Sequence, residues 1–442
     1  MRKISGILTT ALILAVSIFA QVTIAPLKFT ERMLPNGMKV VSLRDNSSPT
    51  VSVHVWYDVG GKNDPPGRSG FAHMFEHMMF KSTKNMPNEK MDRLTEDVGG
   101  FNNASTWDDY TNYYEVVPAN HLEVLLWAEA ERMINLNVDE KNFASERDVV
   151  KEEYRQGVLA EPYGRFFEYI SSLSYEKHPY KRGVIGNLDE LSAATPTDAN
   201  EFYKTFYRPD NATLVVVGDF DQAQLDGWVD KYFAKIPKPA GNIPRVTVSE
   251  PARTAEKRYL KTGPNVPFPA VAITYLGPNS KSNDLAALQV AETILSNGES
   301  SRLYQSLVYR QQIAQEADFT IDNRVDTGLL YFYAVASEGN KPEALEKSLL
   351  AELEKIQTTL VTSKELQKAK NQLITRALRA LETNDGKAIA IERAMIYEGS
   401  AAAVNNAIAK LQAVTASDVQ RVMKKYFTDT NRVVIYYQQE AK

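Results

Sequence analysis

The chain has 442 residues, 43% hydrophobic and 24% charged, proportions that exclude collagen, a wholly disordered chain and a polytopic membrane protein. A formal net charge of −4, with no Gly-rich phosphate loop before a Lys-Ser or Lys-Thr pair, supports neither nucleic-acid nor nucleotide binding. The lack of cysteine excludes disulfides, thiolate zinc sites and a cysteine nucleophile, so any metal must be held by the five histidines or by Asp and Glu.

The first 20 residues are predicted to be a signal peptide. Arg2 and Lys3 precede an apolar stretch, Ile4 to Ala20, that is too short for a comfortable membrane span. We expect cleavage after Ala20, with cleavage after Ser17 and an uncleaved anchor as the alternatives. The mature protein is then exported, into a bacterial periplasm, and keeps no membrane span after cleavage.

A large unit occurs twice in the remaining chain. Six residues recur 220 positions later in matching predicted elements, namely Leu191/Leu411, Ala193/Ala413, Thr195/Thr415, Asp198/Asp418, Lys204/Lys424 and Asn211/Asn431. Each Thr is predicted to cap a helix with the following Asp as its capping-box partner. The same offset relates the predicted strand 51–57 to the strand that begins at Val271. Repetition on this scale indicates duplicated domains.

The seam between the copies is a stretch, Ile236–Pro244, with three prolines and one glycine. We predict a signal peptide at 1–20, an N-terminal domain at 21–236, a linker at 237–255 and a homologous C-terminal domain at 256–442. Alternating strands and amphipathic helices, such as 121–135, predict an α+β fold in which helices pack on one face of a largely antiparallel sheet. His54 alternates with Val53 and Val55 and is expected to point outward from its strand.

The segment His73-Met-Phe-Glu76-His77 places two imidazoles and a carboxylate on one face of a predicted helix, so both histidines can bind one ion. A catalytic zinc site needs three protein ligands and an open position for water. Zinc lowers the pKa of that water to about 7, and a nearby carboxylate can take its proton. The alternative is a solvated polar face. The surrounding Phe and Met residues instead predict a buried helix whose polar groups need partners.

Longer motifs lie in a characteristic order, namely Gly70–Thr83, Gly99–Tyr114, Glu146–Glu153, His178–Tyr180, Val184–Gly186 and Ser300–Tyr304. They resemble the family of pitrilysin, insulin-degrading enzyme and mitochondrial processing peptidase, which are inverzincin zinc metallopeptidases with the order H-x-x-E-H. In that family the third ligand is a Glu about 76 positions after the second His and seven after another Glu, which selects Glu153 and Glu146 here. Without the resemblance, both would be interpreted as surface acids of a helix.

The resemblance implies zinc-dependent hydrolysis of peptide bonds, with one Zn²⁺ per chain bound by His73, His77 and Glu153. It implies that Glu76 is the general base and that Glu146 hydrogen-bonds a ligand histidine.

The resemblance also implies that the peptide substrate adds as a strand along Asn103, Ala104 and Ser105. A plain polar edge strand is the alternative for this segment.

The second copy is expected to be inactive. Adding 220 to the positions of the three ligands and the base gives Thr293, Ser296, Asn297 and Leu373, which cannot replace them.

An Arg and a Tyr seven residues apart, which in the family contact substrate from an inactive half, fall here on Val308 and Gln315, unless the alignment slips toward Arg310. We therefore expect a heterodimer with a homologous subunit that lacks the zinc motif and supplies the Arg/Tyr pair, although a homodimer stays open.

Two other functions compete with a zinc endopeptidase that acts on short or unfolded polypeptides. One is a non-catalytic scaffold subunit of a larger complex, and the other is a peptide-binding, chaperone-like clamp. The intact set of His73, Glu76, His77 and Glu153 argues against the scaffold.

Overall fold

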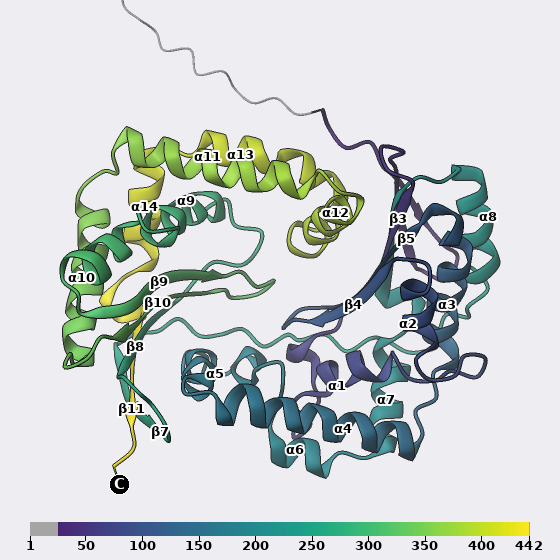
Figure 1. Ribbon diagram of the computed structural model, residues 1–442, viewed down its shortest axis with the longest axis horizontal. Helices are drawn as coiled ribbons and strands as arrows, with labels where there is room; N and C mark the ends of the chain where they lie inside the picture. The colour runs from purple at the N-terminus through teal and green to yellow at the C-terminus, as the bar shows by residue number, and fades with distance from the viewer. Residues whose placement is uncertain (1–24, 442) are drawn as a thin grey trace, which may run out of the picture.

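The computed structural model describes residues 25–441, so the predicted signal peptide at 1–20 lies outside the described residues. Within this range the chain forms two halves, each with one β-sheet and its own helices (Figure 1). This arrangement confirms the predicted α+β fold. No helix within 25–441 is both long enough and apolar enough to cross a membrane.

The strands of the first half are β1 (Thr30–Met33), β2 (Lys39–Arg44), β3 (Thr50–Tyr57), β4 (Phe101–Thr106), β5 (Thr111–Pro118) and β6 (Ala212–Gly218). Those of the second half are β7 (Lys257–Gly263), β8 (Ala270–Leu276), β9 (Ala314–Asp322), β10 (Leu329–Ala336) and β11 (Arg432–Gln439). The spatial orders are β1-β2-β6-β3-β5-β4 and β7-β11-β8-β10-β9. In each sheet one pair is parallel, β2 with β6 and β7 with β11, and the other pairs are antiparallel.

The helices of the first half are α1 (Phe71–Met78), α2 (Lys90–Glu96), α3 (Leu122–Asn135), α4 (Glu140–Tyr154), α5 (Gly164–Ser172), α6 (Leu188–Ala193), α7 (Pro196–Phe206) and α8 (Gln222–Tyr232). Those of the second half are α9 (Leu285–Ser296), α10 (Pro342–Thr358), α11 (Ser363–Ala380), α12 (Asn384–Glu398), α13 (Ala407–Ala413) and α14 (Ala416–Tyr426). The duplicated helices α7 and α14 both begin with the predicted capping box, at Thr195 and Thr415.

The strand pairing corrects one detail of the repeat. Asn211 donates from its side-chain amide to the backbone oxygen of Asp58 at 3.2 Å, and Asn431 donates in the same way to Leu276 at 3.0 Å. The two asparagines are 220 positions apart, but their acceptors are 218 apart. Relating the strand 51–57 to the second half by 220 is therefore wrong by two residues. A shift of two keeps every side chain on its face, because the strand period is two.

Helices cover both faces of each sheet, where the sequence analysis predicted one. The first face of each sheet carries helices of its own half, and the second face carries a helix from the opposite half (Figure 1). The apolar cluster between α12 and the first sheet contains Val41, Leu43, Trp56, Val215, Val217, Ala388 and Ile391. The cluster between α5 and the second sheet contains Phe166, Ile170, Ala270, Ala272, Val433, Ile435 and Tyr437. The two halves are thus joined by reciprocal packing of α5 and α12.

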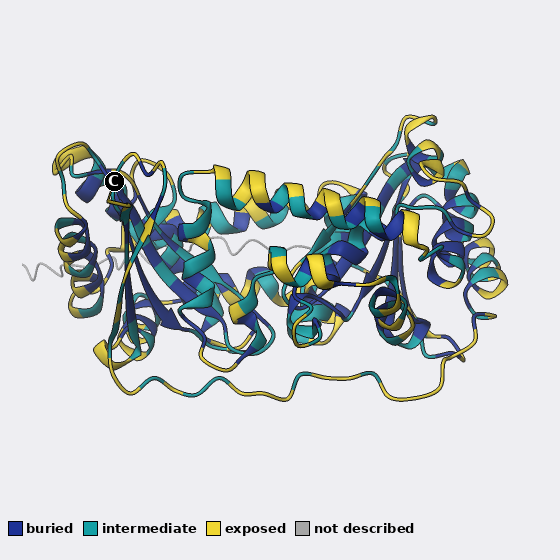
Figure 2. Ribbon diagram, turned by 90° about the horizontal axis from the view of Figure 1, so that it is seen from below, coloured by how far each residue is buried: buried dark blue, intermediate teal, exposed yellow. Residues whose placement is uncertain are grey.

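The proline-rich connector is held in place at several points. Residues 237–256 contain no helix or strand and run along one side of the molecule between the halves (Figure 2). The Glu250 carboxylate accepts three consecutive backbone N–H groups from residues 176–178. The Arg253 guanidinium donates to the backbone oxygens of Ser174 in the first half and Asn431 in the second. This segment therefore ties the halves together. The predicted domain bounds stay a prediction.

Candidate metal centre

Helix α1 carries the His-x-x-Glu-His motif on a partly exposed face. Its opposite face, Phe71, Met74, Phe75 and Met78, is fully buried against the first sheet. The start of the helix is fixed by Asp64, whose carboxylate accepts the N–H groups of Gly70 at 2.7 Å and Ala72 at 2.8 Å. Gly70 has a φ of 88°, and a Cβ there would lie 2.6 Å from the backbone oxygen of Ile185, so glycine is required.

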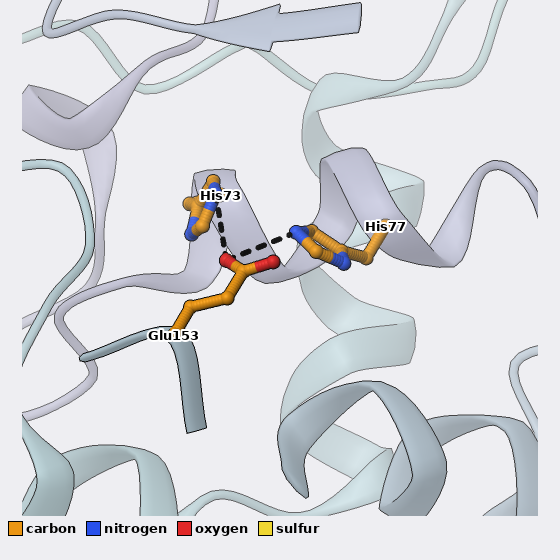
Figure 3. A group of neighbouring side chains, drawn as sticks. All are labelled: His73, His77 and Glu153. Atoms are coloured by element: carbon orange, nitrogen blue, oxygen red, sulfur yellow. Dashed lines mark ion pairs between the residues drawn. The ribbon is translucent and has the colours of Figure 1, made fainter. Parts of the chain in front are cut away.

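The three predicted ligands converge. His73 and His77 lie one turn apart on α1, and Glu153 reaches them from the end of α4 (Figure 3). Glu153 Oε2 lies 3.7 Å from His73 Nε2 and 3.6 Å from His77 Nε2. One ligand atom from each of the three residues lies within 4.8 Å of the others. Among residues 25–441 this is the one group of three or more His, Asp or Glu side chains with such geometry.

The donor set fits zinc. Ligands about 2.0–2.2 Å from a tetrahedral zinc lie about 3.3–3.6 Å from each other, close to the two nitrogen–oxygen distances. Burial, followed by the charge of His77, lowers the pKa of His73 to about 4. Burial also lowers the pKa of His77, but the neighbouring carboxylates of Glu146, Glu153 and Glu76 outweigh it and raise that pKa. A metal bound here would hold both imidazoles in their neutral form. His73 Nδ1 is buried and has no hydrogen-bond partner among the described residues, which leaves its Nε2 as the nitrogen directed at the carboxylate.

Glu146 lies on the far side of His77. Its Oε2 is 3.6 Å from His77 Nδ1, while its Oε1 accepts from Lys81 Nζ at 2.6 Å and from Ser145 Oγ at 2.9 Å. Burial raises the pKa of Glu146, but hydrogen bonds from His77, Lys81 and Ser145 outweigh it, so the pKa is lowered. With the Glu146 carboxylate beside Nδ1, Nε2 is the His77 nitrogen left for a metal.

Glu76 is held by the neighbouring sheet. Thr106, the last residue of β4, donates from Oγ1 to Glu76 Oε2 at 2.6 Å. The pKa of Glu76 is raised, chiefly by burial, toward the range in which a carboxylate exchanges protons efficiently near neutral pH. Thr106 was not singled out from the sequence, although it directly follows the predicted segment 103–105.

The predicted substrate strand is an edge strand. Asn103, Ala104 and Ser105 lie in β4, which pairs with β5 on one side and ends its sheet on the other. The Ala104 N–H donates to the side-chain oxygen of Asn103 at 2.8 Å. The Ser105 hydroxyl donates to Asn112 and accepts from the Trp107 indole N–H. No strand among the described residues pairs with the outer edge of β4.

The second half needs a different offset at this helix. Every position that is buried in 71–78 is also buried in 287–294, where Thr293 is buried in addition, and this match places Gln289, Glu292 and Thr293 where His73, Glu76 and His77 stand. Glu292 accepts the N–H of Ile321 in β9, much as Glu76 accepts from β4. The predicted counterparts Thr293, Ser296 and Asn297 are therefore one helical turn too far along. The capping residues of α4 and α11, Asp139 and Thr362, likewise relate Glu153 to Arg376 in place of Leu373.

The positions predicted for the Arg/Tyr pair lie in or beside β9. Val308 packs against the core of the second half, and Gln315 is exposed on β9. Arg310 is exposed at the end of the preceding helical segment, Tyr304–Arg310. None of the three takes part in the metal centre.

His54 does not point to solvent. Its side chain leaves β3 on the face opposite Val53 and Val55, as the alternation predicted, but α12 of the other half covers that face. The imidazole is fully buried and lies 2.9 Å from Glu392 and 3.1 Å from Asp385. No pattern within the first copy could have indicated a partner more than 300 residues away.

The fold and the side-chain constellation define a class: a duplicated two-half α+β protein whose first half carries a His-His-Glu group that could hold a metal ion, in the inverzincin order. Residues 39–187 match the family model "Insulinase (Peptidase family M16)", and residues 193–373 match "Peptidase M16 inactive domain". The chain belongs to the insulinase family of peptidases, M16.

Named relatives agree with this assignment. The chain is 31% identical over 405 residues to the zinc protease PqqE of Helicobacter pylori. The alignment covers 91% of each of the two chains. It is 26% identical over 404 residues to the "Probable mitochondrial-processing peptidase subunit beta" of Arabidopsis thaliana, covering 90% of this chain and 76% of that one. The crystal structure of a protease from Helicobacter pylori superimposes with a TM-score of 0.90 at 30% identity, over 94% of this chain and all of that one.

Proposed function

We propose that the protein is a zinc-dependent endopeptidase that hydrolyses short or unfolded polypeptides. The observation that supports this most directly is the convergence of His73, His77 and Glu153 on one point, with the buried Glu76 carboxylate beside them on the same helix. Zinc bound by these three side chains supplies Lewis acidity to the peptide carbonyl and to water.

Side chains of the protein carry out proton transfer, hold the base, bind the substrate and orient a ligand. Glu76 takes a proton from the attacking water at its carboxylate and later delivers it to the leaving amine. Thr106 holds that carboxylate through Oε2. Substrate backbone adds to the open edge of β4 along Asn103, Ala104 and Ser105, which gives affinity with little side-chain selectivity. Glu146 keeps the ring of His77 oriented.

The proposed enzyme is a heterodimer. Val308 and Gln315 cannot replace the guanidinium and phenol that the family resemblance leads us to expect, and one relative is named as a subunit. A homologous partner without a zinc motif would supply the Arg/Tyr pair. Full peptidase activity of the purified chain, with no partner in the exported fraction, would contradict this. A signal at residues 1–20 would place the enzyme in a periplasm, and fractionation of the cells tests that location.

A second candidate is a non-catalytic scaffold or peptide-binding subunit. Its support is that much of the chain matches a family model described as an inactive domain. The first half, however, keeps all three candidate ligands and the base.

The deciding experiment compares Glu76→Gln with a matched surface variant, Glu152→Gln, in the zinc-loaded protein with any co-purifying subunit. Glu152 adjoins a proposed ligand but binds only Arg155 and Gln156 among the described residues. With an internally quenched unstructured peptide, Glu76→Gln should lose roughly 10²–10⁴-fold in kcat while zinc content and peptide binding persist. Glu152→Gln should match the wild type. Retained turnover in Glu76→Gln would remove the proposed base, and an inactive wild type would favour the scaffold.

A further inference from the structure

The turn that follows β4 is held by both halves of the molecule. This turn, residues Trp107–Tyr110, directly follows Thr106. From the first half, the backbone N–H groups of Gly61 and Lys62 donate to the oxygens of Trp107 and Asp108, each at 3.0 Å. These bonds connect the turn to the loop that leads into α1.

The second half contacts the same turn through the loop between β9 and β10. Arg324 Nη2 lies 3.2 Å from Asp108 Oδ2, and the Val325 N–H donates to Asp109 Oδ2 at 2.9 Å. Asp109 also receives the Tyr180 hydroxyl and lies 2.8 Å from Lys62 Nζ. A short loop of the second half thus binds two consecutive carboxylates of the first.

Arg324 is enclosed by the first half. Only 5% of the residue is exposed, and its guanidinium stacks over the rings of Tyr175 and Tyr180, with centroids 5.2 and 4.6 Å away. It also donates to Ser171 Oγ at 3.2 Å. Its own half supplies Asp322, whose carboxylate accepts from Nε at 2.9 Å and from Nη2 at 2.6 Å. Separation of the halves would leave the guanidinium with Asp322 and remove Asp108, Ser171 and the two tyrosine rings, so these contacts to the first half exist only when the halves are together.

We propose that Arg324 is a positioning residue for Glu76. It comes from the half without the metal centre and acts through the Asp108–Asp109 turn and Thr106. When the halves are joined, Arg324 orders the turn, the turn fixes the end of β4, and Thr106 then holds Glu76 through its hydroxyl. The Glu76 carboxylate is correctly placed relative to the substrate strand on β4 only when the two halves are in contact. This inference rests on the proposed peptidase activity and adds a role for the second half.

A double-mutant cycle tests the chain of contacts. Thr106→Val keeps the shape but cannot donate, and should lower kcat roughly 10–100-fold with KM changed less than about threefold. Thr106→Ser, which keeps the hydroxyl, should restore most of the rate. Arg324→Gln should lower kcat roughly tenfold alone and less than about twofold in the Thr106→Val background, because both changes release the same carboxylate. Effects that multiply, or a change in KM alone, would overturn the proposal.

A second measurement does not need activity. In the zinc-free protein, hydrogen exchange of the amides in residues 101–111 should speed up roughly tenfold in Arg324→Gln and recover partly in Arg324→Lys. Arg258→Gln is the matched control, because Arg258 pairs with Glu256 and Glu346 entirely inside the second half. Unchanged exchange in Arg324→Gln would refute the positioning role. An inactive wild type would refute the proposed function, and the exchange result would still decide the role of Arg324 in ordering the turn.

Discussion

The two halves share a framework and differ in the side chains placed on it. Both sheets put the parallel pair, the central strands and the edge strand in the same order, and both have the same capping box and the same strand-anchoring asparagine. The chemistry depends on a few positions of one helix. Gln289 and Thr293 occupy, in the second copy, the positions that correspond to His73 and His77 in the first. Fold is therefore a poor guide to function here, and the site must be argued residue by residue.

The edge strands show the difference most directly. In the second half, the outward N–H of Phe319 donates to Ser296 Oγ and that of Ile321 donates to Glu292. Side chains of α9 thus occupy the backbone donors of β9. In the first half, the Ala104 N–H is bonded only to the neighbouring Asn103 side chain among the described residues. One edge has two of its backbone donors occupied by its own domain, which also protects it from aggregation, while the other is the edge where the proposed substrate strand would add.

The sharpest test of the comparison removes a ligand. Glu153→Gln should reduce the zinc content from one ion per chain to almost none and the activity by roughly 10³-fold, because the metal contributes several kcal/mol to the transition state. The matched variant is Arg376→Gln at the corresponding position of α11. It should change neither the metal content nor the rate. Zinc analysis by mass spectrometry, together with peptide cleavage, checks both. Residual zinc in Glu153→Gln would mean that a second ligand set exists.

The stability of the two interfaces between the halves, α12 on the first sheet and α5 on the second, should depend differently on pH. His54 meets Glu392 and Asp385 of α12, whereas the corresponding position of the second sheet, Ala272, meets α5 in an apolar cluster. Burial lowers the pKa of His54, but the hydrogen bonds that its ring donates to both carboxylates overcome this and raise the pKa to about 9 from 6.5. The imidazolium therefore adds stability that is fully present below about pH 6.5 and is lost as the pH rises through 9. At 1.36 kcal/mol per pKa unit this contribution is about 3 kcal/mol.

Urea unfolding between pH 6.5 and 9.5 measures this loss. The double variant His54→Gln/Glu392→Gln removes the cation together with one buried carboxylate, so it does not leave that charge stranded. Its free energy of unfolding should vary much less with pH in this window. A wild type whose stability is flat over the same window would contradict a charged His54.

The next effect in size concerns Glu146. Glu146→Gln keeps a hydrogen-bond acceptor but removes the negative charge beside His77, and should cost roughly 10–100-fold in zinc affinity or activity. Its counterpart in α11 is Ala369, which is buried. The second half therefore has no carboxylate at this position that a matched control variant could change. Competition with a chelator gives the zinc affinity. If Glu146→Gln has the zinc affinity and activity of the wild type, Glu146 contributes only to packing or to the ion pair with Lys81.

Short sequence patterns predicted those parts of the site whose residues are close together in the sequence. The spacing of His73, Glu76 and His77 follows from the helical period, and Thr195 with Asp198 identified a real capping box. Glu153 lies on another helix 76 positions later, so only the family resemblance indicated it. Thr106 and His54 acquire their roles from contacts between strands and between halves, which no window of sequence contains. The fixed offset of 220 failed at α9 and α11 because loops of unequal length separate otherwise matching elements.

The smallest effect tests the shared framework. Thr195→Ala and Thr415→Ala each remove a side-chain oxygen that accepts the N–H of the Asp three residues later, at 3.2 and 3.1 Å. Each should therefore cost about 1 kcal/mol of stability. The caps lie in different halves and share no partner, so their costs should add to within about 0.5 kcal/mol in the double variant. Thermal unfolding of the three variants measures this. Equal costs with unchanged zinc content would show that the copies still share their structural determinants after their chemistry diverged, whereas a cost confined to one cap would show that the framework has diverged as well.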